Sequence, residues 1–237
     1  MSTSPKDAVR ARAWASLRAA GGARFPGVEG RIPNFVGAEA AAAAWVRHPW
    51  FTAARVCKVN PDSPARPLRA AVLRSGRVLV VATPRLTAER PFFLLDPACI
   101  PAAALWEASA QAGAARWGVA CSAAALPPID FIAIGAVALA PDGARVGKGG
   151  GFAELEWALL TEHGKVGPGT RVVSLAHPAQ VVAPGEIPMD SHDLPLDGYA
   201  LPGGVVEVVR PRPRPAGVDP ARLQDGQRAT IPALAGR

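Results

Sequence analysis

The sequence is poor in cysteine and in aromatic residues, and it has no long apolar run. Its three cysteines, Cys57, Cys99 and Cys121, are an odd number without a CxxC pair, which excludes a disulfide scaffold and a cysteine zinc site. Because no stretch of eighteen apolar residues occurs, we expect no membrane span. The N-terminal MSTSPKDAVRARAW has no apolar core, so we expect no secretory signal and predict a cytoplasmic protein.

Small aliphatic residues are what the sequence has in quantity. Hydrophobic residues make up 49% of the 237 and charged residues 19%, which indicates a folded globular chain of one large or two small domains. Aromatic residues are only 6%, so alanine and other small side chains must fill the core. With 24 glycines and 25 prolines, we expect short elements separated by many turns.

The positive charge is concentrated at the C-terminal end. The net charge is +7, and residues 210–237 contain six arginines but only two acidic residues. The high isoelectric point is therefore mostly a property of this segment, and we do not expect a nucleic-acid-binding domain. Since the segment begins with RPRPRP, we predict that 1–209 form the folded domain. Residues 210–237 are then a weakly ordered basic Pro/Arg-rich tail, dispensable for turnover.

The apolar patterns predict strands that alternate with helices. Expected helices cover residues 6–20, 38–46, 67–73, 101–112 and 153–162, the first opened by Ser4-Pro5. Expected strands cover 55–59, 77–82, 171–175 and 205–209, and the run IDFIAIGAVALA at 129–140 is typical of one strand buried on both faces. This alternation predicts an α/β fold with a mostly parallel sheet flanked on both sides.

A glycine-rich loop, RVGKGGGF at 145–152, lies between an expected strand and an expected helix. Glycines let several backbone N–H groups form one concave surface. The helix N-terminus adds positive dipole character, and Arg145 and Lys148 add full charges. The loop therefore predicts a site for an anion, most naturally a polyphosphate, although it is neither a Walker A motif nor GxGxxG. The alternative is a flexible loop with two solvated cations.

Two further groups of charged residues accompany this loop. Glu154, in the first turn of the expected helix, and Asp193 could hold a magnesium ion beside a phosphate; alternatively, Glu154 is a helix-dipole acid, and Asp193 and Asp197 are turn and cap residues. Lys6 and Arg10 are spaced i and i+4, so they could clamp phosphate oxygens from one helix face. The alternative for this pair is a solvated surface.

Together these motifs resemble the 5-formyltetrahydrofolate cyclo-ligase family, also called methenyltetrahydrofolate synthetases. The family's Lys-x-x-x-Arg pair is matched by Lys6 and Arg10, and its R-[LV]-G-x-G-x-G-[YF]-x-[DE] motif is matched by 145–154. A later Gln and N/H-D-x-x-x-D are matched by Gln180 and by residues 192–197. The segments RFPGVEGRIPNFVG, KVNPDSP, VATPRL, GKGGGFAELEWAL and HPAQVV resemble the divergent methenyltetrahydrofolate synthetase domain-containing branch.

The resemblance implies a three-layer α/β/α fold and an ATP-dependent ring closure that turns 5-formyltetrahydrofolate into 5,10-methenyltetrahydrofolate. It implies Arg145 and Lys148 as catalytic residues and Glu154 and Asp193 as ligands of Mg²⁺. The implied ATP-binding residues are Lys6, Arg10, Arg145, Gly147, Lys148, Gly149, Gly150, Gly151 and Phe152. Because the phosphoryl donor and the attacking amine both belong to the ligands, no enzyme nucleophile is required.

The sequence departs from the family pattern where the folate is bound. A family glutamate before the third helix has no clear equivalent in Asp62-Ser63-Pro64-Ala65, and the usual paired tyrosines are Phe152-Ala153. Three hypotheses follow: a folate cyclo-ligase, a related ATP-dependent cyclodehydratase acting on another amide or carboxylate metabolite, and a nucleotide-binding protein without turnover. The predicted partner is a small molecule, and the sequence does not predict an oligomeric state.

Overall fold

The computed structural model describes residues 4–209 and 213–235. Within these residues one eight-stranded sheet has the order β10-β9-β8-β5-β1-β2-β3-β4, and β6 and β7 form a separate antiparallel hairpin. The strands are β1 (Val56–Val59), β2 (Val78–Ala82), β3 (Phe92–Leu95), β4 (Val119–Cys121), β5 (Phe131–Ala133), β6 (Ala138–Leu139), β7 (Arg145–Val146), β8 (Arg171–Leu175), β9 (Gly198–Leu201) and β10 (Gly204–Glu207). The central run from β9 to β2 is parallel, while β10, β3 and β4 add antiparallel edges.

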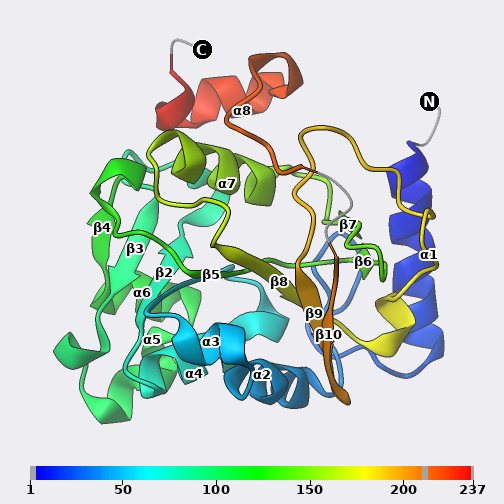
Figure 1. Ribbon diagram of the computed structural model, residues 1–237, viewed down its shortest axis with the longest axis horizontal. Helices are drawn as coiled ribbons and strands as arrows, with labels where there is room; N and C mark the ends of the chain where they lie inside the picture. Colours follow the sequence, from blue (N-terminus) through cyan, green and yellow to red (C-terminus); the bar gives the residue numbers. More distant parts are fainter. Residues whose placement is uncertain (1–3, 210–212, 236–237) are drawn as a thin grey trace.

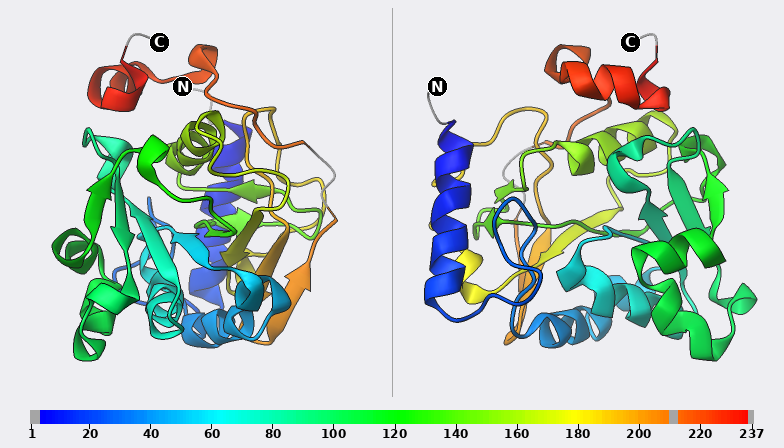
Figure 2. Two further views of the ribbon diagram at one scale, coloured as in Figure 1. Left: turned by 60° about the vertical axis from the view of Figure 1, so that its left-hand side comes forward. Right: turned by 180° about the vertical axis from the view of Figure 1, so that it is seen from behind.

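The helices cover both faces of this sheet (Figure 1). They are α1 (Pro5–Ala19), α2 (Ala38–Val46), α3 (Pro49–Ala53), α4 (Arg66–Arg74), α5 (Leu105–Ala108), α6 (Gln111–Trp117), α7 (Phe152–Glu162) and α8 (Asp225–Thr230). Helices α2 to α6 lie on one face, and α7 and α8 on the other (Figures 1 and 2). Helix α1 packs beside the β6–β7 hairpin at one end of the molecule. The expected mostly parallel α/β sandwich is confirmed.

Side chains of the central strands alternate between the two faces of the sheet, and this divides the core into two clusters. On β1, Cys57 and Val59 belong to the cluster beneath α2 and α4, whereas Val80 and Ala82 of the parallel neighbour β2 belong to the cluster beneath α7. Because successive side chains of a strand point to opposite faces, Lys58 on β1 faces α7. Among the described residues, no helix is long and apolar enough to cross a membrane.

The apolar run at 129–140 is not one strand, as the sequence predicted. Strand β5 ends at Ala133, and the chain leaves the sheet before β6 begins at Ala138. The carbonyls of Ala136 and Val137 accept hydrogen bonds from the buried Gln180 side chain, at 3.0 and 3.1 Å, instead of a sheet partner. Since both parts of the run are buried, its hydrophobicity gives no sign of the break. The glycine loop therefore follows the β6–β7 hairpin.

Two further expectations differ from the structure. The helix expected at 101–112 is divided into α5 and α6, with the Ser109 carbonyl between them accepting a 2.6 Å hydrogen bond from Arg69. The tail was expected to be weakly ordered, but residues 213–235 pack on α7, where Leu223, Ile231 and Leu234 enter the core. Leu223 and Ile231 are eight positions apart, and Pro232 lies between Ile231 and Leu234, so the sequence shows no continuous helical pattern. The start of the segment, 210–212, lies outside the described residues.

Candidate functional site

A cavity of about 790 Å³ lies where the carboxyl ends of β1, β2 and β5 meet the glycine loop. The chain passes from β1 to β2 on one side and returns to β5 on the other, and such a switch of direction opens a crevice in α/β sheets. Every residue that the sequence analysis assigned to nucleotide, catalysis or metal lines this cavity. The structure thus brings them together, and their individual roles remain predictions.

The glycine loop turns into α7 through left-handed backbone. Gly149 has φ +105° and Gly151, the N-cap of α7, has φ +62°, conformations that favour glycine. At Gly150 a Cβ atom would lie 2.8 Å from the ring of Phe152. The loop therefore needs its glycines both for backbone conformation and for close packing. It leads into an eleven-residue helix, whose N-terminus favours bound anions.

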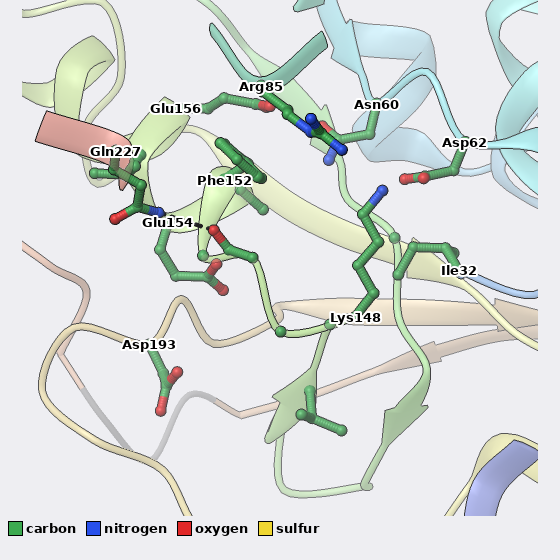
Figure 3. Close-up of a pocket in the computed structure, with 18 of the residues that line it drawn as sticks. Ile32, Asn60, Asp62, Arg85, Lys148, Phe152, Glu154, Glu156, Asp193 and Gln227 are labelled. Atoms are coloured by element: carbon green, nitrogen blue, oxygen red, sulfur yellow. Dashed lines mark hydrogen bonds between the residues drawn. The ribbon is translucent and has the colours of Figure 1, made fainter. Parts of the chain in front are cut away.

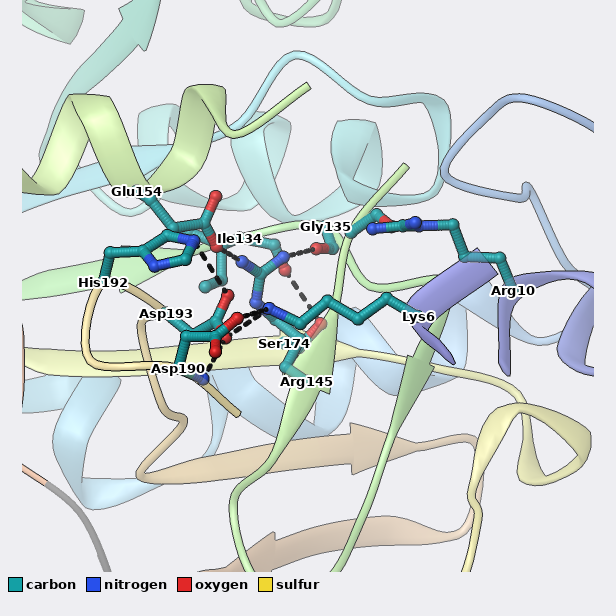
Figure 4. Close-up of polar contacts among 11 residues, drawn as sticks. Lys6, Arg10, Ile134, Gly135, Arg145, Glu154, Ser174, Asp190, His192 and Asp193 are labelled. Carbon is teal, nitrogen blue, oxygen red and sulfur yellow. Dashed lines mark hydrogen bonds and ion pairs between the residues drawn. The ribbon is translucent and has the colours of Figure 1, made fainter. Parts of the chain in front are cut away.

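Arg145 lies beneath this loop and is 3% exposed. Its Nη1 donates a 2.7 Å hydrogen bond to the carbonyl of Gly135, and its Nη2 forms an ion pair with Glu154 in the first turn of α7 (Figure 4). Its Nε is buried without a hydrogen-bond partner. Glu154, predicted as a metal ligand, is thus the carboxylate that neutralises this buried guanidinium.

Lys6 makes a similar pairing from the start of α1. Its Nζ lies 2.5 Å from Asp193 Oδ2 and 3.0 Å from Asp190 Oδ2 (Figure 4). The hydrogen bond from Lys6 lowers the pKa of Asp190. The ligand atoms of Asp190, His192 and Asp193 lie within 4.8 Å of one another. Of the two predicted magnesium ligands, this group contains Asp193 but not Glu154.

Arg10 contacts the loop from the same helix. Its Nε donates a 2.7 Å hydrogen bond to the carbonyl of Gly147, and a Cβ on Gly149 would lie 3.6 Å from its Cζ. A second bond, of 2.6 Å, joins its Nη1 to Asp7. Arg10 therefore supports the loop, and its side chain is not the solvated surface cation of the alternative interpretation.

Lys148 extends across the cavity towards the carboxyl end of β1 (Figure 3). It faces Asp62, whose pKa is raised by burial and lowered to a smaller extent by Lys148 and three other cations. Arg85, which follows β2, projects into the same region with a left-handed φ of +55°. Such backbone is unfavourable for residues other than glycine and is concentrated at functional sites.

A buried ion pair on the floor of the cavity was missed by the sequence analysis. Lys58, 1% exposed, pairs with Glu156 on α7, and its Nζ donates a 2.7 Å hydrogen bond to Asn60 Oδ1. Burial raises the pKa of Glu156, with the Lys58 charge opposing the shift. Asn60 and Glu156 line the cavity. The only signal in the sequence is a lysine inside the apolar run of β1.

The other two positions of the resemblance have structural partners. Gln180 holds the carbonyls between β5 and β6, and its Oε1 accepts a 2.8 Å hydrogen bond from the His177 amide. Asp197 accepts a 2.7 Å bond from the Val172 amide and pairs with Arg214. Neither residue lines the cavity. Both therefore act on the framework of the site.

Three comparisons with known proteins bear on this geometry. The sequence model of the 5-formyltetrahydrofolate cyclo-ligase family matches residues 3–202. The chain belongs to this family. Its resemblance to the cyclo-ligases, drawn above from short motifs, is therefore confirmed over most of its length.

Curated relatives in this cyclo-ligase family carry the name of the divergent branch. The bovine (Bos taurus) methenyltetrahydrofolate synthase domain-containing protein is 34% identical over 230 residues, covering 97% of this chain and 60% of the relative. The human (Homo sapiens) protein of that name is 30% identical with the same coverage. The chain thus spans about three fifths of the length of these relatives.

A solved structure has the same fold as this cyclo-ligase family chain. The NMR structure of Aquifex aeolicus 5,10-methenyltetrahydrofolate synthetase superposes with a TM-score of 0.52 at 19% identity, covering 88% of this chain and 95% of that one. At this identity the likeness concerns the fold alone.

The family match ends at residue 202, whereas Arg222, Gln224 and Gln227 also line the cavity.

Proposed function

We propose that this chain is an ATP- and Mg²⁺-dependent cyclo-ligase that converts 5-formyltetrahydrofolate to 5,10-methenyltetrahydrofolate, with release of ADP and phosphate. One observation carries the proposal. In a chain of the cyclo-ligase family, the glycine loop and the N-terminus of α7 form one wall of a 790 Å³ cavity, with Lys6, Arg145 and Lys148 beside them. Such a combination of amide groups and cations suits a triphosphate.

The residues present fit both ATP and magnesium. Lys6 and Arg145 are each held by a carboxylate, from Asp193 and Glu154 respectively. Phosphate oxygens would compete with these carboxylates for the two cations. The carboxylates freed in this way are the hard oxygen ligands that Mg²⁺ prefers. Magnesium, when bound, supplies neutralisation of the charge on the phosphates. Lys148, which is exposed and extends across the cavity, would contact the transferred phosphoryl group.

The proposed reaction has two steps. The formyl oxygen attacks the γ-phosphorus as the bond to ADP breaks. The neighbouring amine then attacks the formyl carbon and loses its proton, and inorganic phosphate leaves with the former formyl oxygen. The nucleophiles and the leaving groups all belong to the ligands, so the residues of this chain act by positioning and by charge stabilisation. Arg145 and Lys148 are the cations suited to the transferred phosphate.

The acceptor would occupy the end of the cavity away from the loop. Asn60, Asp62 and Arg85 surround that end (Figure 3). The family's glutamate before the third helix has no clear equivalent here, and Glu156, which pairs with Lys58, lines the floor of the same cavity. This polar floor favours, as a second candidate, a cyclodehydratase that phosphorylates an oxygen of a different amide or carboxylate metabolite.

The test is an absorbance assay for the methenyl product with ATP, Mg²⁺ and 5-formyltetrahydrofolate, run beside a panel of small amides. Formation of the product with stoichiometric ADP supports the first candidate. ADP release with another amide, but not with the folate, supports the second. Tight binding of ATP without turnover on any acceptor indicates a nucleotide-binding protein instead. If Mg-ATP does not bind to the folded chain, both enzymatic candidates are wrong.

A further inference from the structure

The C-terminal segment, residues 213–235, lies outside the family match but beside the glycine loop. It passes over α7 and continues into α8 (Figure 1). Arg222, Leu223, Gln224 and Gln227 all line the cavity, as do three residues just before them. These residues therefore add to the cavity a wall from a part of the chain that the family model does not match.

This segment is anchored along the whole length of α7. The Trp157 Nε1 donates a 2.8 Å hydrogen bond to the Pro215 carbonyl, and Glu162 Oε1 accepts a 3.0 Å bond from the Val218 amide. The buried Arg214 side chain packs over the Trp157 ring at 4.8 Å and pairs with Asp197. Apolar side chains of the segment enter the same core as α7. Such contacts fix its position relative to the loop.

Gln227 makes the direct contact with the loop. It is 7% exposed, its Nε2 donates a 2.9 Å hydrogen bond to the Gly150 carbonyl, and its Oε1 accepts a 2.9 Å bond from the Gln224 amide (Figure 3). Both ends of the side-chain amide are thus used. The Gly150 carbonyl shares a planar trans peptide unit with the Gly151 amide, so holding the one also fixes the direction of the other.

We propose that the C-terminal segment completes the nucleotide site, with Gln227 as a positioning residue for the glycine loop and Arg222 as an added cation for the phosphates of Mg-ATP. This inference rests on the proposed nucleotide binding. Arg222 is exposed and lines the same wall of the cavity as Gln227. The segment therefore adds the hydrogen-bond donor of Gln227 and the positive charge of Arg222 beside the glycine loop. The loop must hold its backbone amides in a fixed direction in order to bind phosphate.

The curated relatives are similar to this segment as well. The bovine match covers 97% of the chain, so it extends well beyond residue 213, whereas the family match stops at 202. The added wall thus belongs to the part that this chain shares with the branch and that the family model does not contain.

The test measures the loop and the nucleotide separately in the full chain. Hydrogen exchange of the amides at 147–152 is followed without nucleotide, and the affinity for Mg-AMPPNP is measured by calorimetry. Gln227→Ala should speed exchange in the loop and weaken binding roughly three- to tenfold, the effect of one neutral hydrogen bond. Gln227→Glu keeps the acceptor for the Gln224 amide, so it preserves the cap of α8 while removing the donor to Gly150. It should speed exchange in the loop as Gln227→Ala does, and its added negative charge should weaken binding at least as much.

Arg222→Ala should weaken Mg-AMPPNP binding roughly tenfold without changing exchange in the loop. Thr230→Ala on α8 and Arg47→Ala at the end of α2 are controls, since both residues are exposed and neither lines the cavity. Unchanged loop exchange in both Gln227 variants overturns the positioning role, and unchanged affinity in Arg222→Ala overturns the added cation. Wild-type protein that fails to bind Mg-AMPPNP contradicts the proposed function, while the exchange experiment still decides the role of Gln227.

Discussion

Charged residues in the cavity occur as opposed partners on different elements. Lys6 of α1 faces Asp193, Arg145 of β7 faces Glu154, and Lys148 of the loop faces Asp62. In each pair, a cation of one segment faces a carboxylate of another. An anionic ligand has to exchange these partners, so the effect of each cation on binding depends on how strongly its own carboxylate holds it.

Lys148 is the cation best suited to a test at the residue level, because it is exposed and its loss should not affect folding. Lys148→Ala should lower ATP affinity or turnover by about one to two decades, since a hydrogen bond to a charged group contributes about 1.5–3 kcal/mol. Arg145→Ala should lower it at least as much, and its melting temperature must be checked because Arg145 is buried. ATP kinetics unchanged in both variants would contradict the assignment of the loop to phosphate.

The pKa of Asp62 reports on the same lysine without any nucleotide. Burial raises this pKa, and Lys148 is the largest of the charges that oppose the shift. A cation favours the ionised carboxylate, so Lys148→Ala should raise the pKa of Asp62 further. The titration of the Asp62 carboxyl carbon, followed by ¹³C NMR, should move to higher pH in Lys148→Ala and stay in place in Arg47→Ala. A shift to lower pH, or none, would show that the lysine does not face Asp62.

Between elements, the Lys58–Glu156 pair joins the central strand β1 to α7 beneath the cavity. Both side chains are almost fully buried. Removing one partner leaves an uncompensated charge, whereas removing both leaves an apolar contact. Lys58→Met or Glu156→Leu alone should therefore lower the free energy of unfolding by about 3–5 kcal/mol, and the double variant by clearly less. Urea unfolding followed by circular dichroism measures this difference; a double variant less stable than either single one would contradict the pairing.

The same pair shows why part of the site could not be predicted from the sequence. Local patterns suffice for α2, which has the expected bounds, and for the loop at the start of α7. To predict the Lys58–Glu156 contact, one must know which face of β1 Lys58 occupies and that α7 covers this face. The sequence around either residue contains no pattern that points to the other. The break after Ala133 was hidden because both sides of it are buried. Strand β9 begins with Gly198 and was missed because it lacks the β-branched run of a typical strand.

For the whole molecule, the family domain and the C-terminal segment form one core around α7. The sequence analysis assigned residues 210–237 to a tail because the segment begins with RPRPRP and is rich in Pro and Arg. Its buried apolar residues are few, and they are buried only because the folded domain presents apolar side chains of α7 to pack against. Composition alone therefore underestimated the order of residues 213–235, and the division at residue 209 stays a prediction.

Ligand binding should also be visible in the stability of the whole chain. A nucleotide that binds only the folded state stabilises it by about 2.7 kcal/mol at a hundred times its Kd. For a chain of this size, 1 kcal/mol corresponds to about 2–4 °C in Tm, so saturating Mg-ATP should raise the Tm by about 5–10 °C. Because Lys148 contributes to affinity in the proposed site, Lys148→Ala should need at least about tenfold more Mg-ATP for the same rise. Arg47→Ala should follow the wild-type curve, and a Tm that Mg-ATP leaves unchanged at millimolar concentration would count against a nucleotide site in this cavity.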